Sequence, residues 1–160
     1  MYNDMDRYLS ESNILDNSLS DEKKEKLYRF YEILVEKNKV MNLTSITEIR
    51  EFTFKHLIDS IALEKLIKDI DEREYSIADL GTGAGFPGIP LAITFPNLKL
   101  TLIDSLNKRI KFIFNEIGEQ KEEIGLESMS DLAYTVYCYL SGNNGSEAIK
   151  IKEVLDDFND

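Results

Sequence analysis

The residues best suited to chemistry in this sequence are glycines and carboxylates that flank two apolar runs. Residues 77–80 form an apolar run that contains Asp79, and four glycines follow within residues 81–88. A second apolar run, residues 100–103, ends in Asp104. Glycines at this density let a chain turn sharply off a strand and place bare backbone against a ligand. The pattern predicts a strand, a glycine turn, a helix and a second strand ending in an acid, which together form a βαβ nucleoside-binding unit.

The sequence of this turn matches the patterns of two kinds of cofactor site. Residues 83–88 satisfy the G-x-G-x-x-G pattern of dinucleotide sites, and Asp104 follows at the end of the next strand. Asp79 followed by G-x-G-x-G at residues 81–85 is instead typical of S-adenosylmethionine sites in Rossmann-like methyltransferases. Pro87 lacks the N–H donor that a pyrophosphate needs at a helix start, and S-adenosylmethionine has no phosphate. Its amino group and its ribose need carboxylates, which Asp79 and Asp104 supply. These residues favour S-adenosylmethionine, with a nicotinamide-dependent oxidoreductase as the alternative.

Hydrophobic spacing predicts the elements that must position these residues. Strands are expected over residues 75–80 and 99–104, with a helix over about 88–95 between them. Upstream, apolar residues recur at helical spacing in residues 27–35 and 54–66, whereas residues 1–17 are polar and expected to be loosely held. A further helix is expected to begin at Leu106 or Asn107. Its predicted apolar face comprises Leu106, Ile110, Ile113, Phe114 and Ile117.

Composition narrows the class of protein. With 42% hydrophobic and 31% charged residues, the 160-residue chain has the composition of a soluble globular domain, and a cytoplasmic location is expected. The single His56 and the single Cys138 nearly exclude metal and Cys–His chemistry, so no metal site is expected. The net charge of −11 argues against a strongly basic nucleic-acid surface. Residues 117–160 supply most of that imbalance, with 3 basic and 10 acidic side chains.

Four stretches, in order and at matching spacing, resemble the RsmG (GidB) family of bacterial 16S ribosomal RNA guanine-N7 methyltransferases. The resemblance extends from about residue 32 to 115, and its most specific part is Gly-Thr-Gly-Ala-Gly-Phe-Pro-Gly-Ile-Pro at residues 81–90. The other stretches are residues 38–44, 56–60 and 101–109.

The resemblance implies a Rossmann-like S-adenosylmethionine-dependent methyltransferase fold, S-adenosylmethionine as the cofactor and small-subunit ribosomal RNA as the partner. It also implies that Gly81 and Phe86 contact the cofactor and that Asp104 lies where this fold holds the ribose. The expected cofactor-binding residues are therefore Asp79, Gly81, Gly83, Gly85, Phe86 and Asp104. No catalytic acid or base is expected, because guanine N7 is an acceptor that carries no proton to remove.

The resemblance stops after Asn115. The family continues with an Ala-Glu pair that contacts the adenosine, further strands and a late arginine, whereas no arginine follows Arg109 here. We therefore expect an N-terminal helical segment (residues 1–74), a cofactor-binding βαβ core (75–117) and a divergent or truncated acidic tail (118–160), which leaves the sheet apparently incomplete. A catalytically inactive remnant or binding module of the family is the alternative function.

Several polar and aromatic residues permit either a functional or a purely structural role. Lys108, Arg109 and Lys111 suit contacts with RNA phosphates, and they equally suit a solvated helix face. His56 is expected to be a packing and hydrogen-bonding residue near Phe52 and Asp59. The tyrosines of the tail are expected to pack in a core or at a sheet edge instead of stacking on bases. These are Tyr134, Tyr137 and Tyr139.

Overall fold

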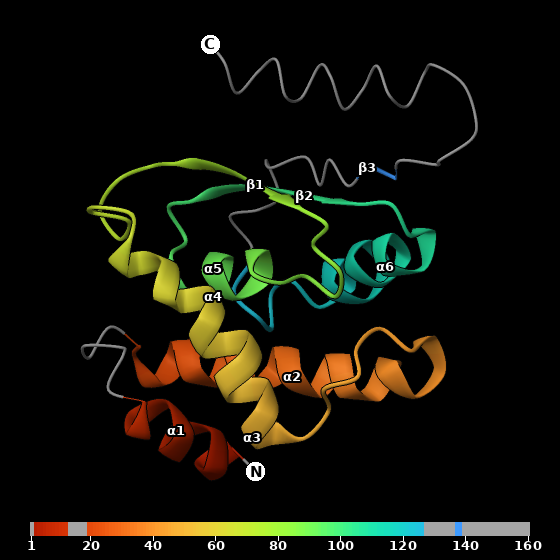
Figure 1. Ribbon diagram of the computed structural model, residues 1–160, viewed down its shortest axis with the longest axis horizontal. Coiled ribbons are helices and arrows are strands. Elements are labelled where there is room, and N and C mark those ends of the chain that lie inside the picture. The colour runs from red at the N-terminus through yellow and green to blue at the C-terminus, as the bar shows by residue number, and fades with distance from the viewer. Residues whose placement is uncertain (1, 13–18, 127–136, 139–160) are drawn as a thin grey trace.

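Helices pack beneath a short parallel sheet in the computed structural model of the protein, which describes residues 2–12, 19–126 and 137–138 (Figure 1). The strands are β1 (Ser76–Leu80), β2 (Lys99–Asp104) and β3 (Tyr137–Cys138). The α-helices are α1 (Tyr2–Glu11), α2 (Asp21–Met41), α3 (Ile49–Phe52), α4 (Asp59–Ile61), α5 (Gly88–Thr94) and α6 (Asn107–Lys111). Two π-helical turns, Thr53–Ile58 and Phe112–Ile117, and a 3-10 turn, Ala62–Lys65, continue the helical runs.

The sheet brings the ends of the first two strands side by side. β1 and β2 are parallel, with a register that runs from Ser76 opposite Lys99 to Leu80 opposite Ile103. Parallel neighbours need a crossover connection, and α5 supplies it. β3 pairs with the other edge of β2, in the order β1-β2-β3. The α/β class and the Rossmann-like βαβ unit are thus confirmed, with a three-stranded sheet among the described residues.

The helical segment supports this unit from below. Figure 1 shows α5 and α6 under the sheet, α2 beneath them and α1 at the bottom of the view. Ser20 caps the start of α2, and its hydroxyl accepts a hydrogen bond from the Lys23 N–H at 3.3 Å. Its buried face packs against α5, and one continuous apolar core extends from α1 to Leu126.

The expectation of a loosely held N-terminus is wrong for residues 2–12. Residues 2–11 form α1, which buries Met5 and Leu9, two residues four apart that lie on the same helix face. The helix packs against α2 and α3, and Lys24 pairs with Asp6 at 2.7 Å. The two buried apolar residues and this ion pair attach the otherwise polar segment to the core.

The predicted apolar face after Leu106 is only partly correct. Ile113 and Ile117 are buried, but Leu106 is 44% and Phe114 59% exposed, while Phe112 is buried instead. The helix becomes π-helical at Phe112, and the wider i→i+5 turn rotates the following side chains away from the positions that a 3.6-residue period predicts.

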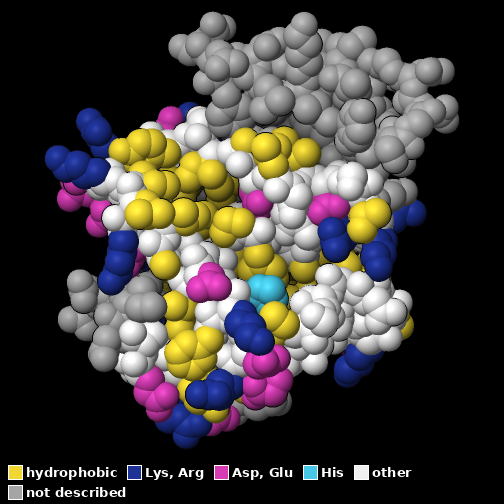
Figure 2. All heavy atoms as spheres, in the orientation of Figure 1, with side chains coloured by type: hydrophobic (Ala, Val, Ile, Leu, Met, Phe, Trp, Pro, Cys, Tyr) yellow, Lys and Arg dark blue, Asp and Glu magenta, His cyan; other side chains and the backbone are white. Residues whose placement is uncertain are grey.

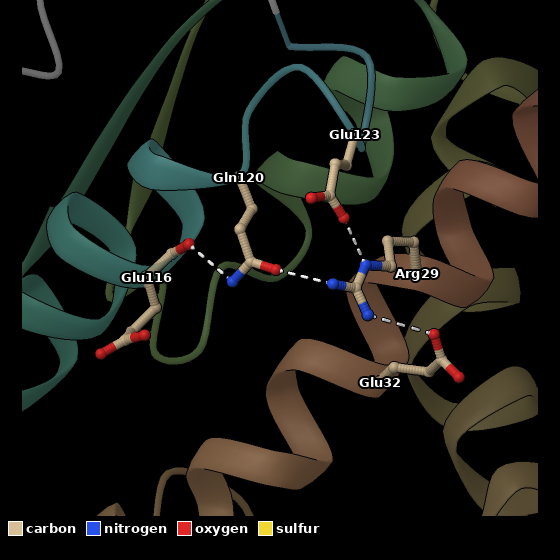
Figure 3. A network of polar contacts seen from close by, with 5 residues as sticks. All are labelled: Arg29, Glu32, Glu116, Gln120 and Glu123. Carbon is tan, nitrogen blue, oxygen red and sulfur yellow. Dashed lines mark hydrogen bonds and ion pairs between the residues drawn. The ribbon is translucent and has the colours of Figure 1, made fainter.

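A polar network attaches the segment after this π-helical turn to α2 (Figure 3). The Arg29 guanidinium donates to Glu123 at 2.7 Å and to Gln120 at 2.9 Å, and it pairs with Glu32 at 3.3 Å. The Gln120 amide in turn donates to the Glu116 carbonyl at 3.3 Å. These contacts attach the end of the helix that follows β2 to α2. Within the described ranges, no helix combines the length and the apolar character needed to cross a bilayer.

Candidate functional site

The glycine turn after β1 is attached to the end of β2 by its backbone. The N–H groups of Gly81 and Thr82 both donate to the Ile103 carbonyl, at 2.7 and 2.9 Å. The next N–H, that of Gly83, donates to Asp104 Oδ2 at 2.8 Å. Three main-chain donors in a short segment thus meet the end of the neighbouring strand. The arrangement places the turn beside the carboxylate that ends β2.

The predicted glycines divide into two kinds. Gly81 and Gly83 have φ values of +79° and +62°. A Cβ atom would meet nothing within 4 Å at Gly81, and at Gly83 only the Gly81 carbonyl at 3.9 Å. Gly85 is buried, and a Cβ there would lie 2.2 Å from the side chain of Ile89. Gly81 and Gly83 therefore present backbone to open space, whereas Gly85 lets α5 approach the turn.

Asp79 holds the two ends of the turn together. Its Oδ2 accepts hydrogen bonds from the Thr82 hydroxyl at 2.7 Å and from the Gly88 N–H at 3.0 Å. The side chain is 7% exposed, and this burial raises the pKa of the carboxyl group above its ordinary value. The hydrogen bonds from Thr82 and Gly88 oppose that shift in pKa, and the nearby charge of Asp104 adds to it. One carboxylate thus links β1, the turn and the start of α5.

Asp104 joins the turn to the segment after β2. Its Oδ1 accepts from the Leu106 N–H at 2.8 Å, and its Oδ2 accepts from Gly83 and pairs with Arg109 Nη1 at 3.3 Å. The carboxylate is 2% exposed. Arg109 Nε is buried and has no hydrogen-bond partner among the described residues. The acid and a partly uncommitted guanidinium therefore lie together at the open side of the turn.

Phe86 points from the turn into the helical segment. Its ring stacks on His56, with centroids 4.2 Å apart and planes at 11°, and lies 5.4 Å from the ring of Phe30 and 5.7 Å from that of Phe52. Burial lowers the pKa of His56 below its ordinary value, which favours the neutral imidazole. The expected packing role of His56 is confirmed, but its stacking partner was missed, since sequence spacing gives no sign of a contact between residues 30 apart.

The cations after β2 are mostly committed to internal contacts. Lys108 Nζ donates to the carbonyls of Met41 and Asn42, at 3.2 and 3.1 Å, and so satisfies the C-terminal end of α2. Arg109 pairs with Asp104, and Lys111 is exposed. Lys108 is exposed but is more than a solvated side chain, and its contact with RNA phosphates stays a prediction. Tyr134 and Tyr139 lie outside the described residues, and Tyr137 starts β3.

No metal centre accompanies this geometry. Across residues 2–12, 19–126 and 137–138, no three His, Cys, Asp or Glu side chains are placed to hold one ion. The chemistry available at the strand ends is therefore that of exposed main chain, two carboxylates and one guanidinium. The two carboxylates suit the hydroxyl groups of a sugar and an amino group more than a phosphate, which they would repel.

Comparison with known proteins agrees with the motifs. The model of the GidB family, described as rRNA small subunit methyltransferase G, matches residues 23–130. Curated relatives named Ribosomal RNA small subunit methyltransferase G include that of Ligilactobacillus salivarius (strain UCC118), 51% identical over 96 residues, which are 60% of this chain and 40% of the relative. That of Staphylococcus carnosus (strain TM300) is 52% identical over 118 residues, 74% of this chain and 48% of the relative.

A third relative, from Lactococcus lactis subsp. lactis (strain IL1403), is 47% identical over 127 residues, 78% of this chain and 50% of its own length. The chain thus spans about half the length of the curated relatives it matches. The matched region contains the glycine turn, both carboxylates, all but the first two residues of α2, and helices α3 to α6. With more than half of its residues matched by the family model, the chain belongs to the GidB family of small-subunit rRNA methyltransferases.

Proposed function

We propose that the chain binds S-adenosylmethionine at the carboxyl ends of β1 and β2 and transfers its methyl group to N7 of a guanine in 16S ribosomal RNA. The observation that carries the proposal is the open main chain of Gly81 and Gly83 beside the Asp104 carboxylate. Ligands of open α/β sheets bind in this position, outside the carboxyl ends of the strands. The relatives are named as methyltransferases of small-subunit ribosomal RNA, which supports the RNA substrate.

The hydrogen-bond acceptors of the site fit the donor groups of this cofactor. A carboxylate offers about four acceptor positions, and Asp104 uses three on Gly83, Leu106 and Arg109, which leaves one for a ribose hydroxyl. The hydrogen bonds from Thr82 and Gly88 both reach Asp79 Oδ2, so its Oδ1 remains for the amino group. Gly85 and Phe86 serve the same site indirectly, by letting α5 approach and by attaching the turn to the helical segment.

Methyl transfer to guanine N7 depends on how the two reactants are oriented and needs no acid–base residues. S-adenosylmethionine supplies an electrophilic methyl group on a sulfonium. Guanine N7 has a lone pair and no proton to lose, so no residue of the chain has to act as a general base. The contribution of the chain is then to hold two reactants in line and to exclude water around them. The site described above, with no acid–base pair aimed at one point, is compatible with that role.

A second candidate function is a binding module that keeps part of the cofactor pocket without catalysing transfer. It is favoured by one observation, namely that the chain spans about half of the relatives' length. It predicts S-adenosylmethionine binding that is weak or absent, and no methyl transfer. A nicotinamide-dependent oxidoreductase has no support from the family match, which is to methyltransferases.

Calorimetric titration with S-adenosylmethionine separates these functions. The methyltransferase proposal predicts a Kd in the micromolar range, at least tenfold weaker binding by Asp104→Ala and unchanged binding by Asp71→Ala, an exposed aspartate elsewhere. Transfer of labelled methyl groups to bare small-subunit RNA is then measured with the same protein. Weak or absent binding of S-adenosylmethionine together with no methyl transfer supports the binding module, and binding of NADH, followed by fluorescence, in place of S-adenosylmethionine refutes both.

A further inference from the structure

A pocket of about 330 Å³ lies between the helical segment and the glycine turn. Its apolar wall consists of Leu63, Phe86 and Pro87, and its polar wall includes His56 and Asp59. This volume is at the lower end of small-molecule pockets, which hold about 300–1,000 Å³, and suits a single flat base. Figure 2 shows the histidine on the face toward the viewer, among hydrophobic, acidic and basic side chains.

The apolar wall of this pocket is fixed by contacts below it. Phe86 stacks on the His56 ring at 4.2 Å and lies edge-on to Phe52 at 5.7 Å, so its ring is held on two sides. Unstacked bases in RNA complexes bind against aromatic and other flat apolar side chains, and their Watson–Crick edges are then available for hydrogen bonds. Phe86 and Pro87 together supply such a wall.

The polar wall contains one uncommitted acceptor. Lys55 is paired with Glu51 at 2.7 Å, and the Ser60 hydroxyl donates to the His56 carbonyl at 2.5 Å. Asp59 is exposed, and its carboxylate makes no hydrogen bond or ion pair with the residues that the structure describes. A carboxylate accepts two hydrogen bonds side by side. Guanine offers such a pair of donors at N1 and N2, whereas adenine has an acceptor at N1, which a carboxylate repels.

The pocket and the candidate cofactor site share the glycine turn. Gly81 and Gly83 face open space on one part of the turn, and Phe86 and Pro87 line the pocket on its next residues. A base that is held through N1 and N2 directs N7, which lies on its opposite edge, away from Asp59. We propose that this pocket receives the acceptor guanine and that Asp59 hydrogen-bonds its Watson–Crick edge. The inference rests on the proposed function and names the residue that selects guanine.

The test measures binding of guanosine and adenosine 5′-monophosphates by NMR titration of the full chain. S-adenosylmethionine is present at saturation, so that the adenosine compound cannot occupy the cofactor site. We expect the guanosine compound to bind about tenfold or more tightly than the adenosine compound, as a good pair of hydrogen bonds to a base gives. Asp59→Asn should remove that preference. Asp71→Asn, which removes the same charge beside a different pocket, should retain it.

The outcomes distinguish the two proposals. If S-adenosylmethionine binds but the two nucleotides bind equally, or Asp59→Asn keeps the preference, the guanine pocket is refuted and the cofactor site stands. If the guanosine preference depends on Asp59 but S-adenosylmethionine does not bind, the pocket stands and the proposed function falls. If neither ligand binds to the folded chain, both are refuted. Asp59 is exposed, so its substitution is not expected to disturb folding, and circular dichroism checks this.

Discussion

Replacing Asp104 with asparagine removes the charge at the point where the glycine turn meets β2. The carboxylate accepts hydrogen bonds from the N–H groups of Gly83 and Leu106, both at 2.8 Å, and is 2% exposed. Asparagine keeps one oxygen, and its NH₂ group must then face one of these two donors. Hydrogen bonds to charged groups contribute about 1.5–3 kcal/mol, and an unsatisfied buried N–H costs about 1–3 kcal/mol. The ion pair with Arg109, at 3.3 Å, is lost as well.

The expected loss is therefore about 2–4 kcal/mol in the free energy of unfolding, or roughly 5–15 °C in Tm for a chain of this size. Urea denaturation followed by circular dichroism measures it without any ligand. Asp71→Asn is the matched control, because it removes the same charge from an exposed position and should change stability by less than about 0.5 kcal/mol. An Asp104→Asn protein as stable as this control would show that the carboxylate does not hold the turn.

Three further predictions concern the turn and its supports. Gly81→Ala should lower the free energy of unfolding by about 1 kcal/mol because of its positive φ. Gly85→Ala should lower it by roughly 2–4 kcal/mol, because its Cβ would also overlap Ile89 of α5. Denaturation curves of the two variants measure these losses, and equal losses would contradict the packing argument. The pKa of His56 is lower in the folded protein than in the unfolded chain, so on acidification the unfolded chain takes up the proton at a higher pH. The stabilisation from the neutral, buried imidazole is therefore complete above about pH 6.5 and is lost as the pH falls below that value. The pH dependence of Tm should accordingly be shallower on the acid side in His56→Gln, and an unchanged slope would refute the assignment. Lys108→Ala should destabilise the end of α2 by about 0.3–1 kcal/mol, and Lys111→Ala should have no measurable effect on unfolding.

Local spacing predicted the βαβ unit well because its signals are local. The strand expected over residues 99–104 is β2, and the helix expected from residue 88 is α5. Each signal affects only the few residues around it. Examples are the apolar run that ends in an acid and the proline and asparagine that end the helix. Element type and position then follow from the sequence without knowledge of the tertiary structure.

The elements that were predicted wrongly depend on tertiary contacts or on unusual helical geometry. Met5 and Leu9 give too weak a stripe to predict α1, which is held by packing against other helices. The exposed Phe114 follows from a π-helical turn, which no apolar period in the sequence reveals. Average periods describe regular helices only, so both errors were to be expected.

The candidate site was predicted in outline and not in its connections. The sequence places Asp79 and Asp104 at the ends of adjacent parallel strands, as the structure does. The hydrogen bond from Gly83 to Asp104 and the stacking of Phe86 on His56 join residues far apart in the chain. Such contacts depend on how helices dock on the sheet, and a single sequence without related sequences holds no record of that docking.

Crystals of the full chain grown with saturating S-adenosylmethionine test the central claim most directly. We predict electron density for the adenosyl group against the main chain of Gly81 and Gly83, with a ribose hydroxyl within about 2.5–3.0 Å of the Asp104 carboxylate. Density elsewhere on the protein, or a turn left empty at concentrations that saturate known methyltransferases, would contradict the account.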